Sequence, residues 1–192
     1  MIFGKSLSRQ PDVELIKRLQ SGEGRALEEI YRRYSPLLLR YFHRMLWQDK
    51  ARAQDALHDV FMKIIENPAR IDSKRIFSTW IYAVAHNHCK NEYRKHAFRN
   101  ASGASNPTET IIQDHAGATL DRKAFQDALD KILEEEGEEA RTMLVLRFEL
   151  DLPFAEIGAV LDCPEGTVKS RLFYLKKRLA QSLIAFKTIL EK

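Results

Sequence analysis

The residues best suited to chemistry lie in two helical segments of the first half of the chain. His86, His88 and Cys89 carry side chains that bind zinc, and Asp55 and Asp59 form a carboxylate pair one helical turn apart. On a helix, however, His86 and His88 point about 200° apart, and no second ligand pair follows at zinc-finger spacing. No oxyanion or phosphate cradle accompanies these groups. We therefore expect no metal site, no cofactor and no catalytic centre.

A stretch in the second half, CPEGTVKSRL at residues 163–172, suits the binding of phosphate instead. Pro164 marks an abrupt helix start, and Gly166 lets a sugar-phosphate chain approach the unpaired amide groups of the first turn. Between residues 165 and 178 one acidic side chain accompanies five basic ones, although the formal net charge of the whole chain is only +4. The sequence therefore predicts a cationic, anion-binding helix face.

This helix is the second part of a predicted helix-turn-helix. A short apolar helix over 154–161 and a tight turn over 162–164 precede it. Its core stripe consists of Val168, Leu172, Leu175 and Leu179. With that stripe buried, Lys169, Ser170 and Arg171 can reach base edges or phosphates in a major groove. The alternative is an ordinary surface helix with a solvated basic face.

A second cationic segment is FSTWIYAVAHNHCKNEYRKHAFR, residues 77–99. Asn87, Asn91 and Arg94 recur at spacings of four and three and so share one helix face. Trp80 lies in the same stretch, and aromatic and basic side chains mixed in this way suit single-stranded or melted DNA, through base stacking and backbone attraction. The alternative for Trp80 is a place in the core.

An acidic edge borders an apolar face in DALHDVFMKII, residues 55–65. Asp55 and Asp59 lie beside Val60 and Phe61, an arrangement that suits docking on a basic helical partner. A plain amphipathic core helix is the alternative for this segment.

The elements that position these residues are all expected to be helical. Apolar residues recur at spacings of three and four from residue 12 to about residue 99, and no segment alternates as a strand would. Ser35 and Pro36 have the pattern of an N-cap followed by proline at the first helical position, and Asp49 has the pattern of another N-cap. A long helix is expected over about 78–97.

Small polar residues fill the segment NASGASNPTETIIQDHAGA, which we interpret as a flexible linker. The predicted fold is therefore all-α, with two small helical domains, residues 1–99 and 120–192, joined by a linker over 100–119. A content of 44% hydrophobic and 30% charged residues is typical of a globular protein, and a basic balance suits a polyanionic partner.

The cysteines and the apolar runs bear on the cellular compartment. Cys89 and Cys163 lie far apart without paired spacing, which excludes a disulfide framework and indicates a reducing compartment. No apolar run is long enough to cross a bilayer, and the first ten residues lack the apolar core of a secretory signal. We expect a cytoplasmic protein without a membrane span.

Three of these segments, in this order and spacing, resemble those of extracytoplasmic-function (ECF) sigma factors, a compact group in the bacterial sigma-70 family. DALHDVFMKI resembles the region that grips core RNA polymerase. FSTWIYAVAHNHCKNEYRK resembles the helix that melts promoters and binds the minus-ten element. FAEIGAVLDCPEGTVKSRLFYLKKRL resembles the helix-turn-helix that binds the minus-thirty-five element. The resemblance spans about residues 12–183 and implies a sigma factor for promoter recognition, DNA melting and transcription initiation.

The resemblance also implies roles for individual residues. The implied contacts with core RNA polymerase are Asp55, Asp59, Val60 and Phe61. The implied minus-ten contacts are Asn87, Asn91 and Arg94, to which we add Trp80 as an aromatic surface. The implied minus-thirty-five contacts are Thr167, Lys169, Ser170 and Arg171, with Lys177 and Arg178 on phosphate. Residues 67–76, NPARIDSKRI, are implied to capture a flipped base. The chain departs from the family at Ala56, His58 and Phe173-Tyr174.

The partners implied are core RNA polymerase, promoter DNA in double-stranded and melted form, and an anti-sigma factor that holds the protein inactive. Two other classes stay open. A stand-alone DNA-binding regulator, with its first half used for dimerisation or ligand sensing, would bind a palindromic operator without polymerase. A metal-dependent or thiol enzyme would show bound metal or activity.

Overall fold

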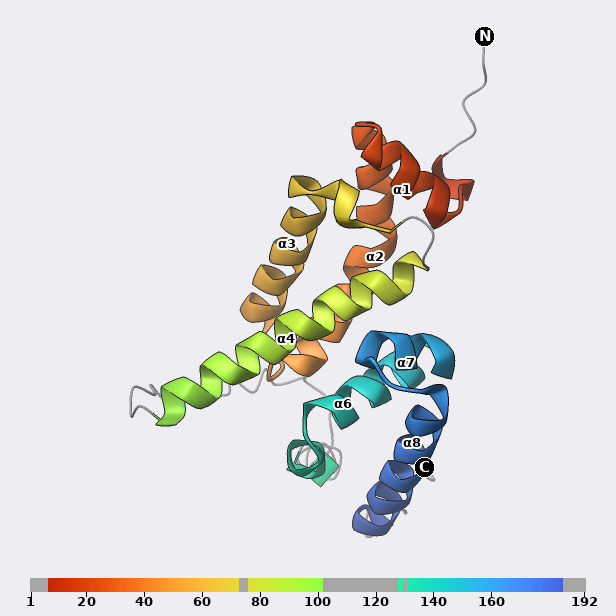
Figure 1. Ribbon diagram of the computed structural model, residues 1–192. Helices are drawn as coiled ribbons and strands as arrows, with labels where there is room; N and C mark the ends of the chain where they lie inside the picture. Colours follow the sequence, from red (N-terminus) through yellow and green to blue (C-terminus); the bar gives the residue numbers. More distant parts are fainter. Residues whose placement is uncertain (1–6, 73–75, 102–127, 130, 185–192) are drawn as a thin grey trace, which may run out of the picture. The chain divides into compact units, whose positions relative to one another are not determined.

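The computed structural model describes residues 7–72, 76–101, 128–129 and 131–184, and the regular structure in these ranges is helical throughout (Figure 1). The chain divides into two compact units, residues 1–105 and 106–192. The predicted all-α, two-domain fold is confirmed. Most of the expected linker lies outside the described residues. None of the described helices is long and apolar enough to pass through a bilayer.

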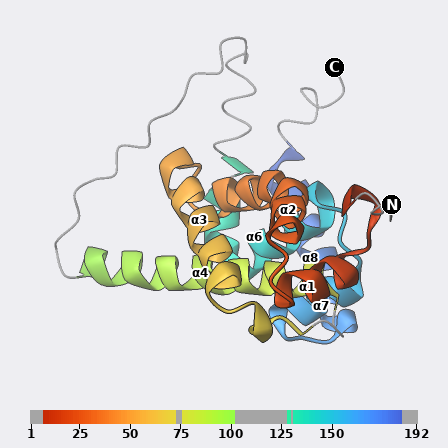
Figure 2. The ribbon, with the colours of Figure 1, turned by 90° about the horizontal axis from the view of Figure 1, so that it is seen from above.

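The described part of the first unit is a helical bundle. Its helices are α1 (Asp12–Gln20), α2 (Gly24–Met45), α3 (Lys50–Glu66) and α4 (Phe77–Ala101), with 3-10 turns at Leu7–Arg9 and Pro68–Arg70. α2 packs against the other three helices. The fully buried core includes Leu15, Ile30, Leu38, Phe42, Ile64 and Ile81. Figures 1 and 2 show that the C-terminal turns of α4 extend beyond α2 and α3.

α2 continues through Ser35 and Pro36, so the prediction that a helix begins there is wrong. Proline cannot donate a hydrogen bond to the carbonyl four residues earlier, which usually ends or kinks a helix. Here the apolar stripe continues on both sides of the proline, because Tyr34, Leu38 and Phe42 are all buried. Packing of that stripe outweighs the one lost hydrogen bond.

The connection between α2 and α3 is short and well fixed. Asp49 caps α3 as predicted, and its Oδ1 accepts a hydrogen bond from the Arg52 backbone N–H at 3.0 Å. Trp47 and Gln48 adopt left-handed backbone conformations, with φ of 54° and 58°. The Trp47 ring meets Tyr93 of α4, with ring centroids 5.0 Å apart. The connection is thereby fastened to α4.

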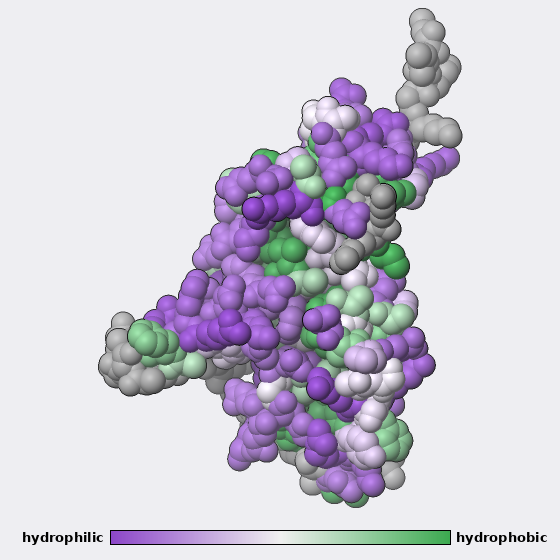
Figure 3. Space-filling model, viewed as in Figure 1, coloured by the Kyte–Doolittle hydropathy of each residue, from purple (hydrophilic) through white to green (hydrophobic). Residues whose placement is uncertain are grey.

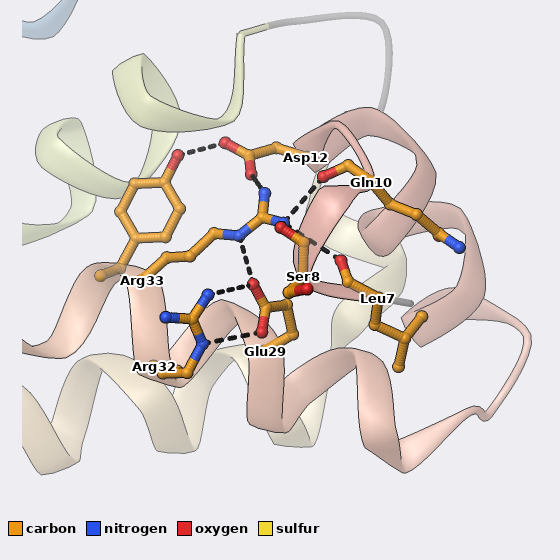
Figure 4. A network of polar contacts seen from close by, with 8 residues as sticks. Leu7, Ser8, Gln10, Asp12, Glu29, Arg32 and Arg33 are labelled. Atoms are coloured by element: carbon orange, nitrogen blue, oxygen red, sulfur yellow. Dashed lines mark hydrogen bonds and ion pairs between the residues drawn. The ribbon is translucent and has the colours of Figure 1, made fainter. Parts of the chain in front are cut away.

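A polar network around Arg33 joins the start of the chain to α2 (Figure 4). Arg33 donates to Asp12 Oδ1 and Glu29 Oε1, both at 2.7 Å, and Arg32 donates to both carboxylate oxygens of Glu29. Three backbone carbonyls also accept from Arg33, those of Leu7, Ser8 and Gln10. Hydrogen bonds from Arg32 and Arg33 lower the pKa of Glu29 to about 2. This Arg33 network fixes α1 against α2.

The described second unit contains the predicted helix-turn-helix. α6 (Glu138–Leu144) continues as a π-helical turn (Val145–Glu149), and α7 (Phe154–Leu161) and α8 (Glu165–Ser182) follow. The bounds of α7 and the turn over 162–164 match the prediction. The helices meet through buried apolar side chains, which include Ile157, Val160, Val168, Leu172 and Leu175.

The turn between α7 and α8 depends on a close backbone approach. A Cβ atom at Gly158 would lie 2.6 Å from the backbone oxygen of Cys163, so a glycine is required there. The Cys163 N–H donates to the Gly158 carbonyl at 2.9 Å. Asp162 ends α7 in the left-handed conformation, with φ of 53°. By contrast, a Cβ at Gly166 would meet open space, so the start of α8 is accessible.

Candidate nucleic-acid interface

α4 presents one face to the core and the opposite face to solvent. The inward side chains are Ile81, Tyr82, Ala85 and Cys89, all at most 1% exposed. Asn87, Asn91 and Arg94 are exposed on the other side, where their spacing predicted them to lie together. Figure 3 shows hydrophilic residues gathered over the C-terminal part of this helix. No ion pair joins Arg94 to any described residue, so its charge is available to an anionic partner.

Trp80 stands at the start of this face, seven residues before Asn87. It is half-buried, and its ring stacks on Phe77 with centroids 5.7 Å apart and planes inclined by 19°. Phe77 is itself buried and meets Tyr34 edge-on at 5.0 Å. Trp80 is therefore backed by the core without being part of it. A supported aromatic surface of this kind suits the stacking of an unpaired base.

The chain segment before α4 is held by a residue that the sequence did not indicate. Gln20, the last residue of α1, donates from Nε2 to the Pro68 carbonyl at 3.0 Å and to the Ile71 carbonyl at 2.8 Å. Both acceptors are backbone atoms far along the chain, so no residue pattern predicts the pairing. Within the expected base-capturing loop, residues 73–75 lie outside the described residues.

α3 exposes only part of its predicted polymerase contacts. Asp55 and Asp59 are exposed, whereas Val60 and Phe61 are 0% and 4% exposed. Phe61 meets the ring of Tyr31 on α2, with centroids 4.7 Å apart. Val60 and Phe61 both lie on the stripe that packs against α2, and polymerase contacts at these two residues stay a prediction.

Other side chains of α3 accompany the two aspartates. Met62 and Ile65 are apolar yet 36% and 49% exposed, and His58 is exposed beside them. The helical spacing from Asp55 and Asp59 places all three on the same side of the helix. The same spacing could have indicated in the sequence that His58, Met62 and Ile65 belong to this surface. α3 therefore presents a surface that is acidic at one end and apolar at the other.

The histidines and the cysteine of α4 are packed between helices. His86 and Cys89 are buried, and His88 Nδ1 lies 3.9 Å from Asp59 Oδ2. Burial lowers the pKa of His88, against the opposite effect of the Asp59 carboxylate. Within the described residues, no group of three or more histidine, cysteine, aspartate or glutamate side chains is placed to hold a metal ion.

α8 brings its predicted contacts to the surface on three sides of the helix. Thr167 is half-buried, and the exposed contacts are Lys169, Ser170, Arg171, Lys177 and Arg178. The centre of the outward face also carries Phe173 and Tyr174, which are 65% and 55% exposed. Their rings meet edge-on at 5.4 Å. Aromatic and cationic groups thus share the face that lies opposite the buried stripe.

Most of the predicted cationic contacts of α8 are in ion pairs within the second unit. The pairs are Lys169–Glu165 at 2.6 Å, Arg171–Glu139 at 2.8 Å and Arg178–Glu136. Lys177 makes no ion pair with a described residue. Glu136 and Glu139 were not predicted as partners of α8, although the acidic run EEEGEE at residues 134–139 was a signal for them.

Family models match both units. One, described as Sigma-70 region 2, matches residues 30–99, and another, described as Sigma-70, region 4, matches residues 126–179. Together they cover well over half of the chain. The chain belongs to the sigma-70 family. The predicted family is confirmed, and this sigma factor acts in transcription initiation.

Curated relatives place the sigma factor in the ECF group. It is 30% identical over 167 residues to the ECF RNA polymerase sigma factor SigL of Mycobacterium tuberculosis. This match covers 85% of this chain and 92% of SigL. It is 26% identical over 190 residues to the RNA polymerase sigma-H factor of Pseudomonas aeruginosa. This match covers 92% of this chain and 96% of the sigma-H factor. The match therefore extends across both units.

A solved structure shares the fold. The sigma factor RpoE of Bartonella quintana, solved in complex with the anti-sigma factor NepR, matches with a TM-score of 0.63 and 21% sequence identity. The match covers 81% of this sigma factor and 97% of that chain. The arrangement of helices described above is thus that of a known sigma factor.

Proposed function

We propose that this sigma factor binds core RNA polymerase through α3, holds the melted minus-ten element on α4 and binds the minus-thirty-five element through α8. The observation that carries the proposal is the exposed polar face on a helix of each unit, within the segments that match regions 2 and 4. The first domain, residues 1–99, and the second, residues 120–192, then act as one bivalent binder, so the spacing of the two elements contributes to specificity.

At the minus-ten element we assign base contacts to Asn87 and Asn91, a backbone contact to Arg94 and base stacking to Trp80. Asparagine amides hydrogen-bond to base edges, and Arg94 neutralises the backbone. Each captured base offsets the few kcal/mol of stacking lost on opening, so the duplex shifts toward the melted state without a catalytic group. The chain thereby selects and opens the start site, and RNA synthesis is left to the polymerase.

Two variants test the minus-ten assignment. Asn87→Ala and Asn91→Ala are each expected to lower the yield of open complex by about tenfold, because a base contact is worth roughly 1–3 kcal/mol. Permanganate reactivity of the melted strand measures this yield. Protection of the upstream element in the same samples serves as the control and should not change. Normal melting by both variants would remove the assignment.

At the polymerase surface the proposal keeps Asp55 and Asp59 and adds Met62 and Ile65. Exposed carboxylates beside exposed apolar side chains support docking on a basic helical partner. Asp59→Lys should weaken capture of core polymerase by the full chain. Glu14→Lys on α1 makes the same charge change away from α3 and should leave capture intact.

Regulation and location complete the proposal. The complex between RpoE and NepR supports an anti-sigma partner for this chain, which would cover the polymerase or DNA surfaces. We place the chain in the cytoplasm with its polymerase and assign it no catalytic activity of its own.

Run-off transcription on genomic fragments tests the whole proposal. Purified core polymerase should start transcription at new sites when the chain is added and not without it. If the chain instead binds a palindromic operator tightly alone and leaves start sites unchanged, it is a stand-alone regulator.

A further inference from the structure

Two arginines of α8 are engaged by glutamates of their own unit. Arg171 Nη1 donates to Glu139 Oε2 at 2.8 Å. Arg178 donates from Nε and Nη2 to the two carboxylate oxygens of Glu136. The arginines are seven residues apart, so they lie on the same side of α8. We call these two contacts the flank pairs, because they run along one flank of the recognition helix.

The flank pairs are exposed enough to exchange. The side chains of Arg171 and Arg178 are 52% and 51% exposed, that of Glu139 is 48% exposed and that of Glu136 is 19% exposed. The Arg171–Glu139 pair is therefore of the weak kind that salt screens, and the Arg178–Glu136 pair is the more firmly held of the two. A DNA phosphate offers a guanidinium the same forked geometry as a carboxylate does. Each arginine can therefore pass from its glutamate to a phosphate with little change in the helix.

We propose that Glu136 and Glu139 are internal counter-ions of the recognition helix, which DNA phosphates must displace from Arg178 and Arg171. This inference rests on the proposed function of α8 as the helix that binds duplex DNA. Non-specific binding depends on phosphate contacts alone, so the two glutamates weaken it most directly. At a promoter, base contacts made by the outward face add free energy that pays for the exchange. The glutamates thus favour discrimination over affinity.

The position of Lys177 supports a selective role for the glutamates. Lys177 lies at the centre of the outward face and makes no ion pair with a described residue, while both arginines on the flank are paired. The unit therefore neutralises the flank and leaves the centre of the helix positive. A duplex that approaches α8 meets Lys177 first and must then compete for the arginines.

The test compares two double variants of the full chain. Glu136→Gln with Glu139→Gln removes the flank pairs, whereas Glu134→Gln with Glu135→Gln makes the same charge change in the same segment. Glu134 and Glu135 are exposed and make no ion pair with a described residue. Binding to a fluorescent duplex of mixed sequence is followed by anisotropy. At low salt we expect the flank variant to bind about 2- to 30-fold more tightly than the control variant. The difference should shrink as salt is added.

Each other outcome overturns the proposal. Equal gains in the two variants would mean that only overall charge matters, and weaker binding by the flank variant would mean that the glutamates position the arginines for DNA. In a third comparison, the flank substitutions are made in a chain that already carries Arg171→Gln and Arg178→Gln. There they should raise the affinity for the duplex no more than the Glu134→Gln and Glu135→Gln substitutions do. A chain that binds no duplex at all removes the proposed function together with this inference. If the flank variant supports normal run-off transcription and binds the mixed-sequence duplex no more tightly than the control variant does, this inference alone is removed.

Discussion

Each unit of the sigma factor pairs arginine with glutamate, but the two systems differ in burial. In the first unit, Arg33 is 22% exposed at its side chain, bonds to two carboxylates and also reaches three backbone carbonyls. In the second unit, Arg171 and Arg178 are about half exposed and each meets a single glutamate. The same residue types therefore serve different purposes.

The difference teaches that burial and the number of partners decide whether an ion pair holds a fold or regulates a surface. Removing Arg33 leaves two partly buried carboxylates and three carbonyls to find new partners, which is costly. Removing Arg171 leaves a carboxylate that water can solvate. The first system belongs to the architecture of its unit, and the second belongs to the exposed side of α8, which we propose binds DNA.

The largest expected effect is on the first unit. Arg33→Met should lower the free energy of unfolding by about 2–4 kcal/mol, because the hub of the network is lost. Arg32→Met is the matched control and should have a much smaller effect, since Arg32 is largely exposed and bonds to Glu29 alone. Tryptophan fluorescence in urea measures this unit selectively, because both tryptophans, Trp47 and Trp80, lie in it. Equal losses in the two variants would contradict the comparison.

In the second unit, the close backbone approach at the turn between α7 and α8 is the expected weak point beside the apolar core. Gly158→Ala should cost about 1–3 kcal/mol, since the new methyl group overlaps the Cys163 carbonyl. Gly166→Ala, a substitution into open space on α8, should instead gain up to about 1 kcal/mol. Hydrogen exchange of the α8 amides reports on both variants. Unchanged exchange in Gly158→Ala would mean that the helices can part without cost.

The third prediction separates stability from binding at α8. Arg171→Gln should change the free energy of unfolding by less than about 0.5 kcal/mol, because the pair with Glu139 is exposed. Binding of the minus-thirty-five element should weaken by about 1.5–3 kcal/mol, because a charged hydrogen bond between Arg171 and the DNA is lost. Footprinting of the upstream element measures the second quantity. A large loss of stability with unaltered binding would reverse the roles assigned to the two arginine systems.

The smallest effect is a dependence on acid. The pKa of Glu29 is lowered from 4.5 to about 2, so its contribution to stability is fully present above about pH 4.5 and is lost as the pH falls toward 2. Glu29→Gln should therefore be less stable than the wild-type chain at neutral pH, and the gap should close only below about pH 4.5. Thermal unfolding across this range measures the gap. A gap that is constant with pH would show that the carboxylate charge is unimportant.

The helices and the outward face of α4 could be predicted because both follow from a period of 3.6 residues. The spacing of Asn87, Asn91 and Arg94 was enough to predict that they share one helix face. The continuation of α2 through Pro36 could not be predicted, because local proline chemistry indicates a helix start and only the packing of the whole stripe overrides it. Burial of the apolar stripe in the folded unit therefore keeps α2 continuous at Pro36.

The site was predicted less completely than the fold. Resemblance to a family carries a residue's role but not its exposure, and Val60 and Phe61 were assigned to a surface although the apolar stripe of α3 buries them. The partners of Arg171 and Arg178 lie 32 and 42 residues away, so sequence spacing could not pair them. Contacts of that kind arise only when the chain is folded.

The bonds that Gln20 makes to the turn at Pro68–Arg70 and to Ile71 have a consequence for anyone who trims this protein. The match to region 2 begins at residue 30, yet the grip on that turn comes from α1, and α1 is itself tied down through Leu7 and Asp12. A shortened chain that starts at residue 30 would keep every position matched to region 2. It would lose the hydrogen bonds from Gln20 and those that Arg33 makes to Leu7 and Asp12. The shortest fragment able to melt a promoter should therefore start no later than Leu7.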